Sequence, residues 1–564
     1  MEDRKSFKVM ITGDSMTQGS EGDYTWRYRL WQWLNSTSGP KIEFVGPYKG
    51  TQAQCGPRRP QPPGFLDEPD AAEEDCKGGK YAEDVESAWY SHSNHFSSWG
   101  YRAADCKDAI LEQINTYQPD YLLVPLGFND MGWLFSDAKD LLREVKDLVA
   151  NARQGKSNIR IILSTVPHRT FMDGREDLVD NTNYYNKHIQ PLIDSLTSPT
   201  SPIHLADFAK HYDCTIATYD GLHPNALGEY QIALSFSEAL QAFSLRPSTC
   251  PLIIPCPVPE PPLPAISHLT AAGFPMGVRL TWSSSFGARS YDVRSRQASS
   301  DRWDETGALG PRFDTTATMP GVQWEYSVRA SRGDGDKYKT AWSEVVSATA
   351  HNNTAPPPSD AIVTPEEGGV KVAWEAVQGW DVERYEVMLW DMDTPGAFFE
   401  GYGARGTAVE MKHLKQGHRY QTWLKTWAVI EGEVAGGAPG GARPFRTGAG
   451  RPEPPGGLRY EVKDPVTVKL DWEPVEDAAA YLVYKRNIVD RLAEFETDGN
   501  CIHETTHEMS VLFPGVWGHE FYVVAVNGDL GSKPSNKVRP SPFAEGAGAA
   551  EATHELERLK IIGS

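Results

Sequence analysis

The stretch FKVMITGDSMTQG, residues 7–19, decides how the N-terminal part of this chain folds. Its first six residues are mostly apolar or β-branched, and the run stops at Gly13-Asp14-Ser15. A short apolar run of this kind is typical of a parallel strand that is buried on both faces. Ligands bind at the carboxyl ends of strands in open α/β sheets, so Ser15 is a candidate nucleophile there. It is also a candidate helix N-cap, because serine is a favoured capping residue.

Downstream of this stretch, strand-like apolar runs alternate with segments of helical periodicity. Strands are predicted at 41–46, 121–126, 158–166 and 203–208, and helices at 26–34, 104–117, 137–153, 181–196 and 225–244. Such alternation predicts a parallel sheet with right-handed crossovers. The fold class expected for residues 1–247 is therefore a three-layer, flavodoxin-like α/β domain.

Two further polar motifs lie downstream, GFND at 127–130 and DGLHP at 220–224. Acyl transfer needs a nucleophile, a base, a group that orients the base, and donors for the oxyanion. Ser15, His223 and Asp220 supply the first three. The spacing of three residues lets Asp220 and His223 face the same way on one turn. The alternative is that Asp220 or its neighbours cap the helical pattern that begins after His223, and capping does not exclude catalysis.

The GDS start, the glycine of Trp99-Gly100, the GxND box and the DxxH box occur in an order that resembles the SGNH, or GDSL, hydrolase superfamily. The resemblance covers residues 1–247. It implies that Ser15 attacks an acyl carbon, that His223 takes the serine proton, and that Asp220 orients the imidazole. It also implies an oxyanion hole made by the backbone N–H groups of Ser15 and Gly100 and the side-chain amide of Asn129. The α/β-hydrolase design is disfavoured, because its G-x-S-x-G serine follows a mid-chain strand.

The connection at residues 48–99 breaks the alternation, since it shows no helical or strand periodicity. A loop of this length inside a compact domain is usually functional or disordered. Its aromatic end leads to Gly100, so we expect residues 89–99 to wall the active site. His92 and His95 are candidate metal ligands, but two histidines without a third ligand are more typical of polar loop residues. The sequence therefore predicts no metal and no cofactor.

The seven cysteines and the first residues of the chain indicate in which cellular compartment the protein is expected. No CxxC pair occurs, which leaves a zinc ribbon or a thioredoxin-like site unsupported. The pairs Cys55/Cys76 and Cys250/Cys256 could each form a disulfide in an oxidising compartment. The start MEDRKSFKVM carries no apolar signal segment, so free thiols and a cytoplasmic location are the default expectation, with secretion by another route as the alternative.

Length and charge limit the remaining possibilities. A chain of 564 residues implies about three to five domains. Its net charge of −21 disfavours nucleic acid or an anionic membrane as a partner, since both need Lys/Arg-rich surfaces. No apolar run approaches the ~18 residues of a membrane span.

Residues 247–264 are nearly half proline, which favours an extended, semi-rigid spacer, so we expect a linker at 248–264. If it separates the two halves, truncation after about residue 247 should leave a folded and active protein. A repeat follows, in which a strand-like run ends in Trp and a Tyr opens the next strand. The repeated residues are Trp282, Trp374 and Trp472, then Tyr291, Tyr385 and Tyr481.

This repeat predicts three β-sandwiches in series. They resemble fibronectin type III domains, at 265–351, 355–447 and 452–541, with a flexible tail at 542–564. The resemblance places the family's corner tyrosine at about Trp324, Tyr420 and His519. Four tryptophans of the second repeat fit an aromatic core better than a ligand-binding face. They are Trp380, Trp390, Trp423 and Trp427.

The function expected from these observations is a serine esterase acting on small acyl groups, with O-acetyl groups on carbohydrate as one candidate substrate. A lipase or lysophospholipase and an acyltransferase remain alternatives, because loops rather than the fold set specificity. An inactive SGNH scaffold or binding protein is the alternative from another class. The intact set Ser15, Asn129, Asp220 and His223 favours the enzyme. The sandwich domains are expected to act as spacers or as surfaces that bind a polymer or a protein.

Overall fold

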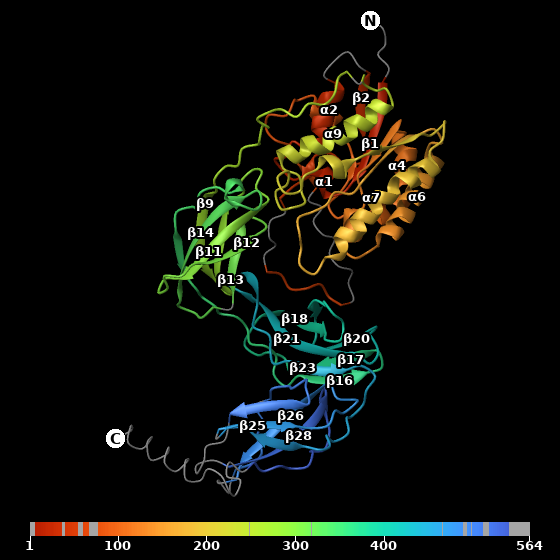
Figure 1. The fold of residues 1–564 in the computed structure, drawn as a ribbon. Coiled ribbons are helices and arrows are strands. Elements are labelled where there is room, and N and C mark those ends of the chain that lie inside the picture. The colour runs from red at the N-terminus through yellow and green to blue at the C-terminus, as the bar shows by residue number, and fades with distance from the viewer. Residues whose placement is uncertain are drawn as a thin grey trace.

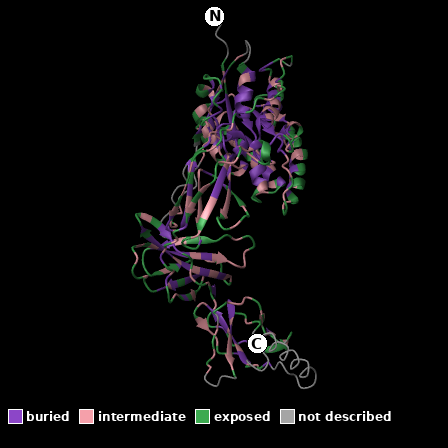
Figure 2. Ribbon diagram, turned by 90° about the vertical axis from the view of Figure 1, so that its left-hand side faces the viewer, coloured by how far each residue is buried: buried purple, intermediate pink, exposed green. Residues whose placement is uncertain are grey.

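The computed structural model describes residues 6–35, 40–54, 60–66, 77–247, 249–316, 318–464, 466–488, 493–497, 499–510 and 518–540. An α/β region lies at one end of the molecule, and sets of β-strands follow it toward the C-terminus (Figure 1). Buried residues are concentrated in the α/β region and continue in the sheets below it (Figure 2). No helix in the described part of the chain has both the length and the apolarity needed to cross a bilayer.

The central sheet of the α/β region is built of parallel strands. They are β1 (Ser6–Gly13), β2 (Lys41–Val45), β5 (Phe96–Ser97), β6 (Tyr121–Val124), β7 (Arg160–Ser164) and β8 (Ile203–Ala206). The order is β2-β1-β6-β7-β8, with β5 paired to β1. Counted along the chain, the five longer strands follow the flavodoxin-like order 2-1-3-4-5. Each begins within two residues of its predicted start.

Helices cover both faces of this sheet. The long ones are α2 (Trp26–Asn35), α4 (Ala103–Tyr117), α6 (Ala138–Gly155), α7 (Asp177–Leu196) and α9 (Ala226–Ala242), and the short ones are α1 (Ser15–Gln18), α3 (Trp89–His92), α5 (Phe128–Gly132) and α8 (Phe208–His211). Figure 1 shows α2 and α9 on one face and α4, α6 and α7 on the other. Helix α7 begins four residues earlier than predicted, and Asp177 and Asp180 lie in its first turn, where acidic residues are favourable.

The connection at 48–99 is more regular than predicted. It contains the antiparallel pair β3 (Thr51–Gln52) and β4 (Lys77–Gly79), then α3 and β5. Strand β5 pairs with the end of β1, at Thr12 and Gly13. Trp89 is fully buried among aromatic rings, including those of Phe44 and Tyr81, so it belongs to the core and does not wall the site.

Each of the three strand sets that follow forms two antiparallel sheets around one apolar core. The first sandwich contains β9 (Ser267–Phe274), β10 (Gly277–Ser283), β11 (Ser290–Gln297), β12 (Asp304–Ala308), β13 (Arg312–Thr316), β14 (Gln323–Ser331) and β15 (Val346–Thr349). The second contains β16 (Ile362–Glu366), β17 (Gly369–Ala373), β18 (Val382–Asp391), β19 (Glu400–Ala404), β20 (Ala408–Met411), β21 (Arg419–Ile430), β22 (Glu433–Gly436) and β23 (Arg443–Arg446). The third contains β24 (Arg459–Val462), β25 (Thr467–Asp471), β26 (Ala480–Asn487), β27 (Thr506–Ser510), β28 (His519–Asn527) and β29 (Leu530–Gly531).

The repeated tryptophan and tyrosine meet in the core of each sandwich. Their rings pack edge to face, with centroids 5.2 Å apart for Trp282/Tyr291 and 5.4 Å apart in the other two pairs. The tyrosine hydroxyl also accepts a backbone N–H of the preceding loop, as in the 2.9 Å bond from Ser285 to Tyr291. The repeat seen in the sequence is therefore a repeated core contact between two rings, in which the tyrosine hydroxyl has a hydrogen-bond partner.

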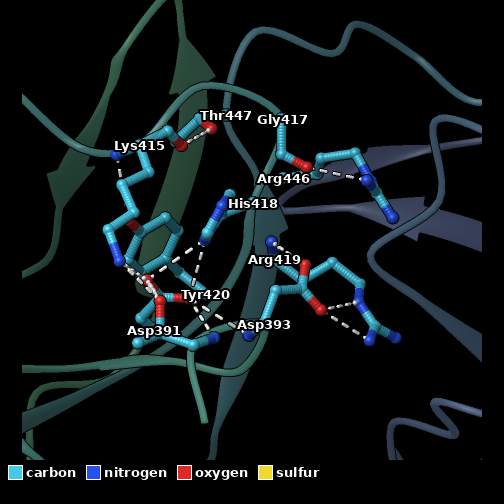
Figure 3. A network of polar contacts seen from close by, with 10 residues as sticks. Asp391, Asp393, Lys415, Gly417, His418, Arg419, Tyr420, Arg446 and Thr447 are labelled. Carbon is cyan, nitrogen blue, oxygen red and sulfur yellow. Dashed lines mark hydrogen bonds and ion pairs between the residues drawn. The ribbon is translucent and has the colours of Figure 1, made fainter. Parts of the chain in front are cut away.

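The corner position differs among the sandwiches. Tyr420 Oη accepts the backbone N–H of Lys415 at 3.0 Å, inside the polar network of Figure 3. In the first sandwich Trp324 Nε1 donates to Thr318 Oγ1 at 2.9 Å instead. In the third, His519 is buried at the start of β28. A tryptophan thus makes a comparable bond at the corner, because its indole N–H can donate.

The tryptophans of the second sandwich are divided between core and surface. Trp427 is buried and its Nε1 donates to Glu386 at 2.6 Å. Trp390 and Trp423 are only partly buried and flank Phe399, whose ring is 5.7 Å and 5.3 Å from theirs. The prediction of core packing therefore fails for Trp390 and Trp423.

The proline-rich stretch after the α/β region is not a free spacer. Trp33 Nε1 on α2 donates to the carbonyl of Cys250 at 2.9 Å, and Leu252 is buried. At the other end, Arg332 of the first sandwich donates to the carbonyl of Pro262 at 2.8 Å. Cys250 and Cys256 are free thiols, and Cys55 and Cys76 lie outside the described residues.

The proline-rich part of the 48–99 connection reaches the second sandwich. Arg384 donates to the carbonyl of Pro63 at 2.8 Å. The guanidinium groups of Arg384 and Arg405 lie 3.9 Å and 3.4 Å from the ring centre of Phe65. Arg279 of the first sandwich in turn pairs with Glu433 of the second. The α/β region therefore contacts more than one sandwich.

Candidate active site

Ser15 is the first residue of α1, immediately after the turn that ends β1. A Cβ at Gly13 would lie 2.3 Å from Thr17 Oγ1, so this turn has no space for a side chain. The N-cap of α1 is Asp14, whose Oδ1 accepts the N–H of Met16 at 3.0 Å. The alternative of Ser15 as the cap is therefore wrong, and its hydroxyl points to a different partner.

That partner is His223. Ser15 Oγ lies 2.9 Å from His223 Nε2, and His223 Nδ1 lies 2.6 Å from Asp220 Oδ2. The other carboxylate oxygen of Asp220 accepts the backbone N–H of His223 at 2.7 Å and that of Leu222 at 3.0 Å. Ser15 is 7% exposed. The structure thus brings together the three residues for which the sequence predicts catalysis, in the predicted order of contact.

The charge of Asp220 is stabilised by its neighbours. Burial alone would raise the pKa of this carboxyl group, but the hydrogen bonds and the charge of His223 lower it by more. Arg289 lowers it further. The pKa of Asp220 therefore lies well below its usual range, and the group is ionised at neutral pH.

A tight turn sets the geometry of the DxxH box. Gly221 has φ of +80°, and the N–H of Tyr219 donates to the carbonyl of His223 at 2.9 Å. Helix α9 begins just after the box and is capped by Asn225, whose Oδ1 accepts the N–H groups of Leu227 and Gly228. Because Asn225 supplies the cap, Asp220 and His223 are free for their mutual contact.

Two tryptophans border these residues. The ring of Trp99 stacks on the His223 imidazole, with centroids 4.8 Å apart and an interplanar angle of 16°. Trp99 is 39% exposed, so the aromatic end of the 48–99 connection does reach the site. Trp133 is 61% exposed, and a Cβ at Gly100 would lie 3.0 Å from its ring. The sequence motifs assign no role to Trp133, although the aromatic residues Trp133 and Phe135 shortly after the GFND box are a usable signal.

The three predicted oxyanion donors lie at one edge of the sheet. Strands β5 and β6 both pair with β1, so the segments that follow all three strands leave the sheet at the same edge. Gly100 has φ of +80°. Asn129 Nδ2 donates to the carbonyl of Tyr101 at 3.0 Å, which leaves the amide a second N–H. Asp130 accepts the N–H of Ala103 at 2.9 Å and so ties the GFND box to the start of α4.

The two histidines of the 48–99 connection lie elsewhere. His95 is fully buried, its Nε2 lies 3.2 Å from the carbonyl oxygen of Gly50, and its Nδ1 accepts the N–H of Ser97. The ring of His92 stacks on Trp31 at 6.3 Å. Within the described part of the chain, no group of three or more His, Cys, Asp or Glu residues could hold a metal ion.

Asp14, which lies beside the candidate nucleophile, has a raised pKa. It is 1% exposed, and burial raises its pKa to about 7, with a contribution from Asp130. The folded state therefore binds this proton more tightly than the unfolded state does. The resulting stabilisation is present below about pH 4 and is lost as the pH rises through about 7.

We therefore predict that Asp14→Asn flattens the pH dependence of stability. An asparagine oxygen can keep the cap on Met16, but the side chain takes up no proton. Between about pH 5 and pH 8 the wild type should lose stability relative to the variant, by up to about 3 kcal/mol. Thermal unfolding of both proteins across this range measures the difference. Parallel stability curves would contradict the assignment.

Comparisons with solved structures find partial, distant similarities. An acetyl esterase mutant with acetate ion is 19% identical, with a TM-score of 0.32, and carbohydrate esterase family 3 proteins from Talaromyces cellulolyticus and Clostridium thermocellum are 21% and 18% identical, with TM-scores of 0.32 and 0.31. Each comparison covers 42% of this chain and 97% of the other. The chicken CNTN1 FN1–FN3 domains are 14% identical with a TM-score of 0.17, over 49% of this chain and 99% of theirs. No family model and no curated protein sequence matches the chain.

Proposed function

We propose that this protein is a serine esterase of the SGNH type that hydrolyses small acyl esters through an acyl-enzyme intermediate. One observation carries the proposal, the hydrogen-bonded chain from Ser15 Oγ through His223 to Asp220, with contacts of 2.9 Å and 2.6 Å. Contacts in this order are what a serine nucleophile, a general base and an orienting carboxylate require.

The proposed reaction follows from these contacts. His223 Nε2 takes the proton as Ser15 Oγ attacks the acyl carbon, while Asp220 holds the Nδ1–H and stabilises the imidazolium. The backbone N–H groups of Ser15 and Gly100 and the amide of Asn129 donate to the oxyanion. The imidazolium then protonates the leaving alcohol. Water, activated by the same base, releases the acid from Ser15.

The rim of the site supports a compact substrate with an apolar face. Trp99 and Trp133 both present exposed rings there, and Trp99 also covers one face of the base. Flat aromatic surfaces suit the apolar face of a sugar ring, so O-acetyl groups on carbohydrate are the proposed substrates.

Covalent labelling and a substrate series test this function together. A fluorophosphonate should modify Ser15, as located by peptide mass, and acetyl esters should be cleaved faster than long-chain p-nitrophenyl esters. Acetylated oligosaccharides should release acetate. A rate that increases with chain length would favour a lipase, and acyl transfer to an added alcohol over water would favour an acyltransferase. The absence of both labelling and hydrolysis would favour a scaffold protein.

The strands after residue 264 are proposed to form three fibronectin type III-like domains, at the boundaries predicted from the sequence. Two observations support this division, the repeated Trp–Tyr core contact and the corner bond of Tyr420. Their proposed role is to bind a polymer or a protein, and the exposed Phe399 between Trp390 and Trp423 is a candidate surface for it.

A further inference from the structure

The first sandwich contacts the segment that carries Asp220 and His223. The N–H of Asp334 donates to the carbonyl of Tyr219 at 2.6 Å. A Cβ at Gly333 would lie 2.4 Å from that same carbonyl oxygen, so the approach requires glycine. The ring of Tyr338 packs edge to face on the ring of Tyr219, 5.1 Å away. The residue just before Asp220 is therefore held by the sandwich through its backbone and its side chain.

The same turn of the sandwich also holds the other end of the segment. Asn225 Nδ2 donates to Tyr338 Oη at 2.9 Å, in a buried position. Asn225 lies two residues after His223 and caps α9 with its other side-chain atom. Within the α/β region, the segment is held by the N–H of Thr170, which donates to Gly221, and by the hydroxyl of Tyr212, which donates to Leu222. The sandwich thus contacts the DxxH box at both ends, although Asn225 Nδ2 is also held within the α/β region by the carbonyl of Ile216 at 2.9 Å.

Arg289 adds a positive charge to this contact. Its side chain is 14% exposed, and its Nη2 lies 2.8 Å from Asp23 Oδ2 in the α/β region. Its guanidinium carbon lies 4.2 Å from the ring centre of Tyr219. Burial acts to lower the pKa of Arg289, but Asp23, Tyr219, Asp220 and Glu229 raise it by more, so it remains a cation.

Further contacts fix the sandwich closely against the α/β region. A Cβ at Gly22 would lie 2.5 Å from the Cα of Gly287, so the two backbones touch. Gln54 donates to the carbonyl of Ser285 at 3.0 Å and accepts from Ser284 Oγ at 2.9 Å. Figure 1 shows the first sandwich, in green, beside the α/β region. The contact therefore extends well beyond Arg289.

We propose that the first sandwich is a working part of the active site, in which Arg289 and Tyr338 are positioning residues that hold the Asp220–His223 pair against Ser15. This inference rests on the proposed esterase function. Neither residue contacts Ser15 or the proposed acyl group. They act through Tyr219 and Asn225, the neighbours of the pair. A misplacement of about 1 Å in such a pair can cost about 100-fold in rate.

The charge of Arg289 gives the proposal a pH signature. The cation opposes proton uptake by the coupled Asp220–His223 pair, as its lowering of the pKa of Asp220 indicates. Without the cation, the pair should take up its proton at a higher pH. The acid limb of kcat/KM should then move to higher pH. The titratable and charged groups that face Arg289 or Asp220 are Asp23, Tyr212, Tyr219, His223, Glu229 and Arg332.

The test uses four variants of the full chain, with pH profiles on the best acetyl ester. Arg289→Met should lower kcat by about 10- to 100-fold with little change in KM, and should move the acid limb upward. Arg289→Lys keeps the charge and should restore the wild-type position of the limb. Tyr338→Phe loses one hydrogen bond and should lower kcat without moving the limb. Arg296→Met is the matched control, because it removes an ion pair with Glu325 in the same sandwich. It should leave kcat and the position of the acid limb unchanged.

The outcomes separate this inference from the proposed function. If the wild type neither hydrolyses esters nor is labelled at Ser15, the esterase function fails. If the wild type is active and Arg289→Met matches Arg296→Met in kcat and in pH profile, the positioning role is wrong. If Arg289→Met does not fold, Tyr338→Phe still decides, because wild-type kcat in that variant would overturn the proposal.

Discussion

Replacing Ser15 with alanine should lower kcat/KM for acetyl esters by about 10⁴-fold or more. The substitution removes the oxygen that lies 2.9 Å from His223 Nε2, and with it the proposed nucleophile. The fold should persist, since the cap of α1 is Asp14 and the turn depends on Gly13. Ester hydrolysis, fluorophosphonate labelling and thermal unfolding of the same preparation measure the three expectations.

Ser91 offers a matched control. It lies on α3, it is exposed, and it takes no part in the hydrogen bonds that link Ser15, His223 and Asp220. Ser91→Ala should therefore keep wild-type activity and labelling. Hydrolysis at the wild-type rate by Ser15→Ala would show that another group attacks the ester, and the assignment of the nucleophile would have to be withdrawn.

Asp220→Asn should reduce kcat by about 10⁴-fold with the fold retained, a magnitude that matches the corresponding change in serine proteases. The reason lies in the two carboxylate oxygens. Oδ1 accepts the N–H groups of Leu222 and His223, so the amide oxygen of asparagine should occupy that place. The amide N–H₂ then faces His223 Nδ1 and donates to it. The imidazole proton is forced onto Nε2, which can no longer accept the proton of Ser15.

Asp213→Asn is the control for this change. Asp213 also accepts a backbone N–H two residues on, from Thr215 at 2.9 Å, but it does not contact His223. Its replacement should leave kcat unchanged. His92→Ala should likewise keep activity, because His92 lies against Trp31 and away from Ser15. Full activity of Asp220→Asn, or its loss in His92→Ala, would require a different base.

The sequence was sufficient for features that depend on local pattern. The apolar run before Gly13 predicted β1, and the periodic segments predicted the long helices to within a few residues. The order of the motifs predicts that Ser15, Asp220 and His223 act together, and the structure places them within hydrogen-bonding distance. Their catalytic roles, and that of Gly100, remain predictions.

Features that depend on distant partners could not be predicted. Strand β5 has only two residues, and it is a strand because the end of β1 offers it backbone partners. Nothing near Arg289 in the sequence distinguishes it from the other arginines of the sandwich. Its importance comes from Asp23 and Tyr219, which are far away along the chain. The proline-rich segment predicts a spacer from its composition alone. That composition does not show that Trp33 donates a hydrogen bond to the carbonyl of Cys250 within the segment.

The contact of Phe65 with Arg384 and Arg405 has a consequence for how this protein can be divided. An insertion of the α/β region touches the second sandwich, while Tyr219 and Asn225 touch the first. The α/β region is thus not an independent domain that can be moved to another protein by itself. We expect a fusion that moves it to another scaffold to keep its chemistry only if β9–β15 move with it, which differs from the active truncation after about residue 247 that the sequence predicts. Shuffling of the sandwiches should be tolerated best at the far end of the chain.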